Sequence, residues 1–491
     1  MTEPLALRPY QIEDLGWHIA NPRSLNESHP GTGKTPTMCV LAYFHWARRG
    51  KKTVWAMPKS LMRKNKKELL RFTTFRDEDV EIFHTDHKKL TASWKGPTFV
   101  RQKRTRVATG KLGPDGAPRM KTAYVDEPAA DLIAASNAKV FICTFAFLRA
   151  HWQRLIESHP DIDLVLTDEH HLGYKSNDSE QTKSLYHIMK HATNCCFMTG
   201  SLIDGALDHA FPAIHIIEPR YYGSHQGFLA AHAGFIDDYG RVQVWQNEEK
   251  IRRILERHSR RHTFEEVYGE EPVVFFHEEI EMGTRCREAY DQFHEQAMLE
   301  LENAEFLDGT LPGVATIRAR QIMAHPETMG IAKGEITGKD ERLAVFAGEG
   351  QPMLIFAALK PEQQRIQQLL TSLGLRAGLI NSDVSANRRN EIDLAFQESR
   401  LDAIVASGPT AGVGYNWERA DHVIYVSVDY QDVNFIQSYR RASRGTRTTT
   451  LRVTSLAYED SIDQRMYAIL KAKSELANRV DSTRRVLAFA A

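Results

Sequence analysis

A glycine-rich loop near the N-terminus carries residues that could bind phosphate. Residues 27–35 read ESHPGTGKT, and the apolar spacing of the following TMCVLAYFHWARR is helical. Gly31, Thr32 and Gly33 are therefore expected at the start of a helix. Unpaired backbone N–H groups and the positive end of the helix dipole attract phosphate at such a position.

The next two side chains extend this prediction to nucleotide chemistry. Lys34 would reach the terminal phosphates of a nucleotide, and Thr35 would offer its hydroxyl to magnesium. The strict phosphate-loop pattern has a glycine where this chain has Ser28. A flexible turn that happens to contain two glycines is therefore the alternative for the loop taken alone.

A pair of carboxylates supplies the second half of a hydrolytic site. Residues 164–171 read LVLTDEHH, an apolar strand that ends in Asp168 and Glu169. Ligands of parallel α/β sheets bind at the carboxyl ends of the strands. Asp168 could hold magnesium, and Glu169 could orient and deprotonate an attacking water molecule. A surface acidic pair is the alternative, but the loop and the pair together favour hydrolysis of ATP or GTP.

These residues need parallel sheets to position them, and the sequence predicts two. Short apolar runs alternate with longer amphipathic stretches, which is typical of sheets flanked by helices. The runs of the first sheet are 52–58, 139–145, 163–169 and 194–200, and those of the second are 352–358, 376–382, 401–407, 421–427 and 450–456. We therefore predict two α/β domains, 1–270 and 271–491, with helical protrusions and few strands in the charged stretch between residues 205 and 345.

Composition agrees with a globular protein and sets limits on other classes. The 491 residues contain 63 basic and 63 acidic side chains, so whole-molecule charge predicts neither nucleic-acid binding nor its absence. The five cysteines have no spacing that suggests a zinc site or a disulfide framework, which indicates a reducing, cytoplasmic environment. Neither an apolar signal core nor a membrane-spanning apolar run is present in the sequence.

One segment of the first domain interrupts the α/β pattern. Residues 98–126 contain two extended stretches around GPDG, a strong turn signal, and predict a long β-hairpin insert. Its basic side chains include Arg101, Lys103, Arg104 and Arg106. A nucleic-acid contact and a solvated loop are both consistent with this composition.

The order of these motifs resembles superfamily 2 helicases and, within them, the Swi/Snf-like DNA translocases. LRPYQIEDLGW (7–17) is similar to the segment before the phosphate loop, and PKSLMRKNKKELLRF (58–72) and FICTFAFLR (141–149) are similar to later motifs. The resemblance implies nucleotide contacts from Arg8 and Gln11, with Gln11 reading adenine. It implies nucleic-acid contacts from Lys59 and Thr144.

The acidic pair and the segment after it continue the resemblance. DEHHLGYKSNDS (168–179) resembles the family's acidic box with its following Lys and Asn, here Lys175 and Asn177. MTGSLI (198–203) stands where the family has a Thr-Gly-Thr-Pro coupling motif, with Thr199 as a further nucleic-acid contact. The chain departs from the family at Leu202, in place of the proline, and at His170, in place of an alanine.

The second half carries the most specific motifs. INSDVSANRRNEIDLAFQ (380–397), TAGVGYNWERADHVIYVSVDY (410–430) and QSYRRASRG (437–445) resemble the family's motifs IVa, V and VI. The matching residues are Arg389 and Asn416 for nucleic acid, Gly414 for the nucleotide, and Arg441 and Arg444 for catalysis.

The resemblance implies a fold, a cofactor and a mode of action. Two tandem RecA-like domains would bind ATP and Mg²⁺, and Arg441 and Arg444 of the second domain would stabilise the charge on the transferring phosphoryl group. DNA would be held through its phosphates without regard to sequence. No membrane association is expected.

The motifs leave the type of motor open. We expect a bacterial or viral helicase on forked or branched DNA, acting in replication, recombination or repair, with the hairpin as a wedge. A duplex translocase that does not separate strands, such as the motor of a restriction, defence or remodelling assembly, is the first alternative. A non-hydrolysing DNA-binding protein is the second.

Overall fold

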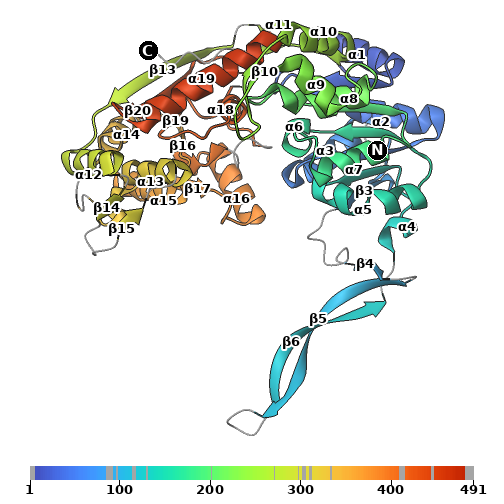
Figure 1. Ribbon diagram of the computed structural model, residues 1–491, viewed down its shortest axis with the longest axis horizontal. Helices are drawn as coiled ribbons and strands as arrows, with labels where there is room; N and C mark the ends of the chain where they lie inside the picture. The colour runs from blue at the N-terminus through green and yellow to red at the C-terminus, as the bar shows by residue number, and fades with distance from the viewer. Residues whose placement is uncertain are drawn as a thin grey trace. The chain divides into compact units, whose positions relative to one another are not determined.

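The computed structural model describes most of the chain as two compact units (Figure 1). It describes residues 6–83, 92–95, 98–112, 118–128, 131–200, 202–269, 271–296, 298–300, 306–308, 312–331, 334, 336–408, 415–443 and 447–481. The N-terminal unit comprises Met1–Ser28, Gly33–Leu202 and Leu207–Arg261. The C-terminal unit comprises His29–Thr32, Ile203–Ala206 and His262–Ala491.

The N-terminal unit is built on a parallel sheet. Among its described residues, seven strands lie in the order β12-β1-β9-β8-β2-β7-β3. Their bounds are β1 Arg23–Asn26, β2 Lys52–Ala56, β3 Val80–Phe83, β7 Val140–Cys143, β8 Ile162–Thr167, β9 Asn194–Met198 and β12 Ser259–Arg260. All four strands predicted for this sheet are present, and β7 and β9 are buried along their whole length. Strands covered on both faces are expected to be continuously apolar.

Helices and short hairpins surround this sheet. The helices are α1 Pro9–Ala20, α2 Lys34–Arg49, α3 Lys59–Phe72, η1 Asp77–Asp79, α4 Leu132–Ala135, α5 Phe145–Ser158, α6 His170–Gly173, α7 Glu180–Ile188, η2 Leu207–Ala210, α8 Phe211–Ile217, α9 His225–His232 and α10 Glu248–His258. A hairpin joins β10 Ala233–Ile236 to β11 Val242–Trp245. Helix α2 begins after Gly33 and ends before Gly50, both in the left-handed region, which glycine enters without strain.

The predicted hairpin insert is present in the backbone. Strand β5, Thr98–Leu112, pairs antiparallel with β6, Pro118–Pro128, and β4, Ala92–Lys95, pairs with β5. Lys103 lies opposite Val125, and Gln102 lies opposite Asp126. The side chains of Arg101, Lys103, Arg104 and Arg106 lie outside the described part of the structure.

The C-terminal unit contains a second parallel sheet. Six strands of its described residues follow the order β13-β20-β19-β16-β18-β17. Their bounds are β13 Val273–Ile280, β16 Met353–Phe356, β17 Ala377–Ile380, β18 Ala403–Ala406, β19 His422–Tyr425 and β20 Leu451–Tyr458. The helices are α11 Phe264–Tyr268, α12 Thr284–Gln296, α13 Pro312–Ala324, η3 Pro326–Met329, α14 Gly338–Gly348, α15 Lys360–Ser372, α16 Ala386–Gln397, α18 Asp432–Tyr439 and α19 Ile462–Val480. A small hairpin joins β14 Met298–Glu300 to β15 Phe306–Asp308.

Strand β13 corrects one expectation from the sequence. The stretch between residues 205 and 345 was expected to contain few strands, yet β13 pairs with β20 over eight residues. Val274 and Phe276 point to the exposed face of this edge strand, at 46% exposure each. The segment Val273–Ile280 is therefore a strand because it pairs with β20, and this partner cannot be identified from the sequence of the segment itself.

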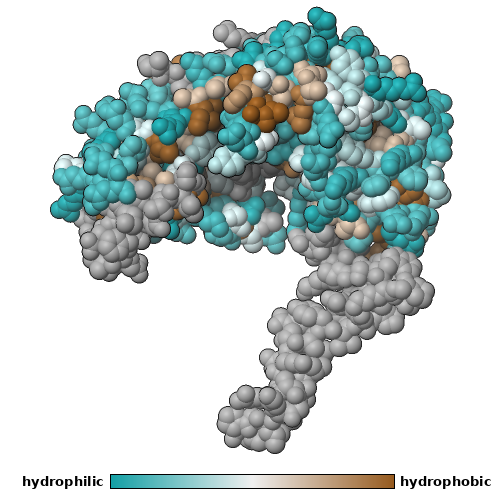
Figure 2. Space-filling model, in the orientation of Figure 1, coloured by the Kyte–Doolittle hydropathy of each residue, from teal (hydrophilic) through white to brown (hydrophobic). Residues whose placement is uncertain are grey.

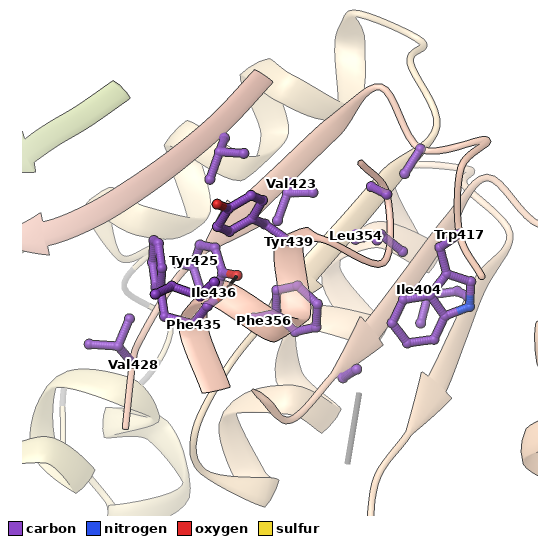
Figure 3. Close-up of a cluster of buried hydrophobic side chains, with 14 of the residues drawn as sticks. Leu354, Phe356, Ile404, Trp417, Val423, Tyr425, Val428, Phe435, Ile436 and Tyr439 are labelled. Carbon is purple, nitrogen blue, oxygen red and sulfur yellow. Dashed lines mark hydrogen bonds between the residues drawn. The ribbon is translucent and has the colours of Figure 1, made fainter. Parts of the chain in front are cut away.

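Aromatic side chains fill the core of the C-terminal sheet (Figure 3). Trp417 is fully buried and donates from Nε1 to Asp393 Oδ1 at 2.9 Å. Tyr425 stacks on Phe435 and donates its hydroxyl to the Phe435 carbonyl at 2.9 Å. Both buried polar atoms thus have partners, as packed interiors require.

The face drawn in Figure 2 is mostly hydrophilic where it is coloured.

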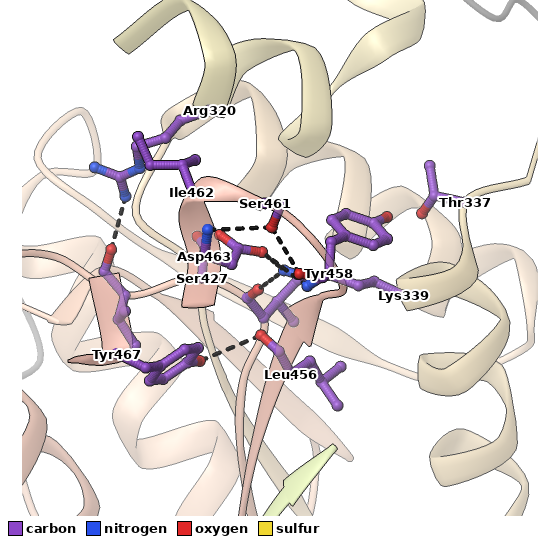
Figure 4. Close-up of polar contacts among 12 residues, drawn as sticks. Arg320, Thr337, Lys339, Ser427, Leu456, Tyr458, Ser461, Ile462, Asp463 and Tyr467 are labelled. Atoms are coloured by element: carbon purple, nitrogen blue, oxygen red, sulfur yellow. Dashed lines mark hydrogen bonds and ion pairs between the residues drawn. The ribbon is translucent and has the colours of Figure 1, made fainter. Parts of the chain in front are cut away.

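A buried ion pair joins α14 to the start of α19 (Figure 4). Lys339 Nζ lies 2.6 Å from Asp463 Oδ2 and donates to the Val426 carbonyl at 2.6 Å. The two side chains are 4% and 8% exposed. Glu362 lies nearby, where burial raises its pKa while the charge of Lys339 opposes that rise.

We predict that Lys339→Met destabilises the chain by about 3 kcal/mol or more, because it leaves a buried carboxylate without its cation. The double variant Lys339→Met/Asp463→Leu should recover much of the loss, since both charges are then removed. Lys360→Met is the matched control, because the Lys360–Asp383 pair is 50% and 61% exposed and should contribute about 1 kcal/mol at most. Urea denaturation measures all three, and equal effects of the two lysine substitutions would contradict the prediction.

Candidate active site

The loop between β1 and α2 is braced by α1. Gln11 Nε2 donates to the Gly33 carbonyl at 2.9 Å, and the backbone N–H of Arg8 donates to Gln11 Oε1 at 2.8 Å. Gly33 has φ of 91°, and a Cβ added there would lie 2.5 Å from Gln11 Nε2. This position therefore requires glycine, both for its backbone and for the space that Gln11 occupies.

The first turn of α2 presents the predicted phosphate-binding groups. Lys34 and Thr35 are its first two residues, and Pro36 is the third. A proline costs no helical hydrogen bond there, because the first N–H groups of a helix have no partner within the helix. Lys34 Nζ donates to the Ser28 carbonyl at 2.5 Å, and Ser28 N donates to Asn26 Oδ1 at 3.2 Å. A bound phosphate would compete with a loop carbonyl for the lysine.

The middle of the loop is held by residues of the C-terminal unit, to which it belongs. His29 N donates to the His262 carbonyl at 2.8 Å, and the Tyr268 hydroxyl donates to the Gly31 carbonyl at 3.1 Å. Thr32 Oγ1 donates to the His29 carbonyl at 2.7 Å. Gly31 has φ of 88°, a second left-handed glycine in the loop.

Asp168 lies at the carboxyl end of β8 with both carboxylate oxygens bonded. Asn65 Nδ2, from α3, donates to Oδ2 at 2.8 Å, and Glu169 N donates to Oδ1 at 3.0 Å. Asn65 Nδ2 also lies 3.4 Å from Met57 Sδ. These contacts orient the carboxylate before any metal is present.

Electrostatics connect Asp168 to the phosphate loop. Burial raises the pKa of Asp168, and the neighbouring Glu169 raises it further. The hydrogen bond from Asn65 and the charges of Lys34 and Lys64 lower this pKa and so favour the ionised form. The lysine of the loop is thus close enough to act on the carboxylate of β8.

Glu169 adopts an uncommon backbone conformation. Its φ and ψ are 50° and 53°, in the left-handed region that non-glycine residues rarely enter. Glu169 Oε2 lies 3.7 Å from His171 Nδ1, and that nitrogen lies 2.9 Å from Thr199 Oγ1. Strained residues persist where the surroundings fix them, often at functional sites. The conformation directs the second carboxylate to the end of β9.

His170 has a structural role. It is fully buried, its Nδ1 lies 3.0 Å from Thr167 Oγ1, and its ring stacks on Phe197. Burial lowers the pKa of His170 to about 3, so the imidazole is neutral. Among the described residues no cluster of three His, Cys, Asp or Glu side chains could hold a metal.

Magnesium nevertheless fits the carboxylates that are present. Mg²⁺ is usually bound through one or two carboxylates, substrate phosphates and water, so it needs no cluster of three protein ligands. Asp168 supplies an ionisable carboxylate whose orientation is fixed by Asn65. Thr35, in the first turn of α2, would supply the hydroxyl.

The predicted nucleic-acid residues of the N-terminal unit differ in exposure. Lys59 is exposed at the start of α3, and Lys175 is half-buried. Thr144 caps α5 by accepting from Phe147 N at 3.1 Å, and a hydroxyl that accepts can still donate to a phosphate. Asn177 Oδ1 accepts from the Tyr186 hydroxyl at 3.0 Å. Thr199 is fully buried, so in this conformation its hydroxyl serves His171 and not a surface ligand.

The predicted residues of the C-terminal unit lie on a helix, a loop and a turn: Arg389 in α16, Asn416 in the loop before β19 and Arg441 after α18. Arg389 Nε donates to the Val384 carbonyl at 2.7 Å, and Asn416 is exposed. Arg441 is 8% exposed in the turn after α18. Gly414 and Arg444 lie outside the described residues, so their predicted roles stay predictions.

Sequence reasoning missed Asn65 and His171 as parts of the site. Asn65 lies inside the stretch compared with motif Ia, but nothing in its sequence neighbourhood points to Asp168. His171 was assigned no role, although its place two residues after Glu169 could have suggested a link to the strand end at Thr199.

Comparisons with known proteins show what the chain is similar to. A family profile described as the helicase conserved C-terminal domain matches residues 338–446. The mouse (Mus musculus) chromodomain-helicase-DNA-binding protein 1-like is 22% identical over 342 residues, which are 65% of this chain and 36% of that protein. The SWI/SNF chromatin-remodeling complex subunit snf22 of Schizosaccharomyces pombe is 19% identical over 405 residues, 75% of this chain and 23% of that protein. The chain thus spans well under half the length of either relative.

A solved structure supports the fold. S. cerevisiae Dbp5 bound to RNA and ADP BeF3 aligns over 97% of this chain and 93% of that chain, with a TM-score of 0.53 and 12% identity. The two parallel α/β sheets are therefore those of tandem RecA-like domains. In the described part of the chain no helix is both long and apolar enough to cross a bilayer. In sequence the chain is thus similar to the helicase conserved C-terminal domain and to proteins named as chromodomain-helicase and SWI/SNF chromatin-remodeling proteins.

Proposed function

We propose that this chain is a DNA-dependent ATPase that couples hydrolysis to movement along DNA. The observation that carries the proposal is the placement of Lys34 at the start of α2, after a loop that follows β1, and of Asp168 at the carboxyl end of β8 in the same parallel sheet, where the charge of Lys34 lowers the pKa of Asp168. Neither motif alone distinguishes a nucleotide site from a turn or a surface acidic pair. A lysine and a carboxylate that act on each other satisfy the first requirement of a site for phosphate and metal.

The residues divide the chemistry between them. Lys34 would exchange the Ser28 carbonyl for a phosphate oxygen, and Thr35 and Asp168 would hold Mg²⁺, which neutralises phosphate charge when bound. Glu169 would orient and deprotonate the attacking water. The contact from Glu169 through His171 to Thr199 offers a route by which the state of the site reaches the end of β9.

Arginines of the C-terminal unit would complete the site. An inserted guanidinium stabilises a transferring phosphoryl group by about 10³ to 10⁵ in rate. We assign this role to Arg441 and Arg444, as the resemblance of their segment implies. Hydrolysis would then require Arg441 and Arg444 to reach the nucleotide. Release of phosphate would let them withdraw, and repetition of this cycle would move the protein along the strand in steps.

DNA is proposed as the track on two grounds. One of the relatives is named as a DNA-binding protein, and the motifs resemble those of DNA translocases. Phosphate contacts from Lys59, Thr144, Lys175, Arg389 and Asn416 would be independent of sequence and weaken with salt. Because the Dbp5 structure contains RNA, each binding experiment should also measure binding to an RNA strand of the same sequence.

The hairpin of β5 and β6 favours strand separation over simple tracking. It is a long antiparallel ribbon with basic residues in its sequence, inserted between β4 and α4. We propose that it acts as a wedge on forked or branched DNA, in a replication, recombination or repair setting. Duplex translocation without unwinding, as in a restriction, defence or remodelling assembly, is the alternative.

The ATPase prediction concerns Lys34 and Glu169. We expect DNA-stimulated hydrolysis by the wild-type chain, and a loss of at least about 10² in kcat for Lys34→Ala and for Glu169→Gln, because each removes a group that acts on the reacting phosphate or water. Release of phosphate with and without DNA measures both. Equal turnover in the absence of DNA, or turnover unaffected in both variants, would show that the site is elsewhere.

A second prediction concerns Asn65 and pH. Asn65→Leu removes a donor to Asp168, so the pKa of Asp168, already raised by burial, should rise further. Because the ionised carboxylate is the form that binds metal, the acidic limb of the pH profile of kcat/KM should move to higher pH. Lys67→Leu, an exposed position on the same helix, is the control. A lower plateau with an unmoved limb would assign Asn65 a packing role only.

The wedge prediction uses the register of the hairpin. Replacing residues 103–125 with Asn-Gly leaves Gln102 opposite Asp126 and closes the shortened strands with a two-residue turn. DNA-stimulated ATPase should persist while unwinding of a labelled fork is lost. Arg104→Glu/Arg106→Glu keeps the length and tests charge alone. Unwinding by the shortened chain at the wild-type rate would exclude the wedge, and a wild-type chain that translocates without unwinding would favour the alternative motor.

A further inference from the structure

A cavity of about 300 Å³ opens at the carboxyl ends of β16, β17, β18 and β19 in the C-terminal unit. Its lining includes Ala357 after β16, Asn381 after β17, Ser407 after β18 and Ser427 after β19. Strand β16 pairs with β18 on one side and β19 on the other, so the chain order reverses about it. Ligands of open α/β sheets bind at such a reversal point.

Aromatic rings line part of this cavity, and Figure 3 labels three of them, Phe356, Tyr425 and Phe435. Phe356, Tyr425 and Phe435 line it and are 1%, 2% and 3% exposed. Tyr425 and Phe435 stack with ring centroids 4.1 Å apart. Small-molecule pockets span about 300 to 1,000 Å³ and are mostly apolar with a few placed polar groups. The volume therefore suits one flat ring system and is too small for a nucleoside triphosphate.

The polar groups of the wall are fixed by one another. Asn381 Nδ2 donates to Gln363 Oε1 at 3.1 Å, and Asn434 Nδ2 donates to Asp429 Oδ2 at 2.8 Å. Gln431 N donates to Asp429 Oδ1 at 2.9 Å. Amide and carboxyl groups held in one orientation can pair with the edge of a heterocycle without losing further side-chain entropy.

The charges around the cavity disfavour an anion. Asp429 lies in the wall, and Ser427, also in the wall, donates to the buried Glu362 at 2.6 Å. Lys360, the lysine among the described lining residues, lies 2.6 Å from Asp383 and is half-exposed. A phosphate would meet carboxylates with little uncompensated positive charge. The occupant should therefore be a neutral ring.

The cavity also adjoins the proposed path of nucleic acid. Asn381 and Ser382, on its rim, begin the loop that reaches Val384, and the Val384 carbonyl accepts from Arg389 at 2.7 Å. Arg389 is one of the residues assigned to phosphate contacts. A strand held at Arg389 would therefore pass close to the mouth of the cavity.

We propose that this cavity receives one nucleobase of a bound strand, turned out of the stack onto Phe356, Tyr425 and Phe435. The inference rests on the proposed function for the source of the base. Proteins that take bases out of the stack hold them by stacking and by hydrogen bonds to the base edge. We expect little preference for one base over another, because stacking on aromatic rings tolerates every base.

Gly408 offers a way to close the cavity. It lines the wall, and a Cβ added there would lie 3.7 Å from Asp429 Oδ2 and 3.8 Å from Asn434 Cβ, which is ordinary contact. Gly408→Met should therefore fold and fill the space. Gly348→Met is the matched control, because Gly348 is exposed on α14 with no atom near its added Cβ.

The test compares an intact single strand with an abasic strand of equal length and charge, by fluorescence anisotropy at fixed salt. Stacking of one base contributes roughly a 5- to 150-fold difference in affinity. We expect Gly408→Met to bind the intact strand at least about fivefold more weakly than wild type and the abasic strand equally well, with Gly348→Met like wild type. An equal intact-to-abasic ratio in wild type and Gly408→Met would overturn the cavity's role.

Further arms separate the possible failures. Titration of free adenosine, followed by ligand-observed NMR, tests whether the cavity binds a free nucleoside. If Gly408→Met abolishes adenosine binding and leaves strand binding unchanged, the proposal that the base comes from a bound strand is overturned. If Gly408→Met weakens binding to RNA strands and not to DNA strands, the cavity would still receive a base, and the bound strand would be RNA. If the wild-type chain binds no strand, both this inference and the proposed function are overturned. If it binds strands with the same intact-to-abasic affinity ratio as Gly408→Met, this inference alone is overturned.

Discussion

The proposed active site depends on one carboxylate whose ionised form is opposed by burial. Asp168 at the end of β8 is 8% exposed, and burial and Glu169 both raise its pKa. The opposing interactions come from two helices: the hydrogen bond of Asn65 and the charge of Lys64 in α3, and the charge of Lys34 in α2. These elements meet only because parallel strands bring their carboxyl ends to one edge of the sheet.

Much of the scaffold can be predicted from the sequence because its signals are local. Buried parallel strands read as short apolar runs, and all nine predicted runs correspond to strands of the two sheets. The phosphate loop and the acidic pair are likewise contiguous in sequence. By contrast, the Asn65–Asp168 bond joins residues 103 positions apart, and β13 becomes a strand only through its pairing with β20. Contacts between distant segments leave no pattern in a single sequence.

The two parallel sheets use their carboxyl edges differently. In the N-terminal unit that edge carries ionisable groups and a glycine loop suited to phosphate. In the C-terminal unit it carries aromatic rings and pre-bonded amides around a cavity, with carboxylates that disfavour phosphate. Ser427 links this edge to the interior, since its hydroxyl accepts from Ala358 N at 2.8 Å and donates to Glu362. Glu362 in turn lies near the Lys339–Asp463 pair. One fold thus offers a proposed nucleotide site in one unit and a candidate base site in the other.

The central claim is that Lys34 and Asp168 belong to one site for phosphate and Mg²⁺. The most direct test is the affinity of a non-hydrolysable ATP analogue, measured by calorimetry with and without Mg²⁺, for the wild-type chain and for Asp168→Asn. The account predicts that Mg²⁺ strengthens binding to wild type and that this strengthening is largely lost in Asp168→Asn, while Glu169→Gln retains it. An unchanged Mg²⁺ effect in Asp168→Asn would contradict the account.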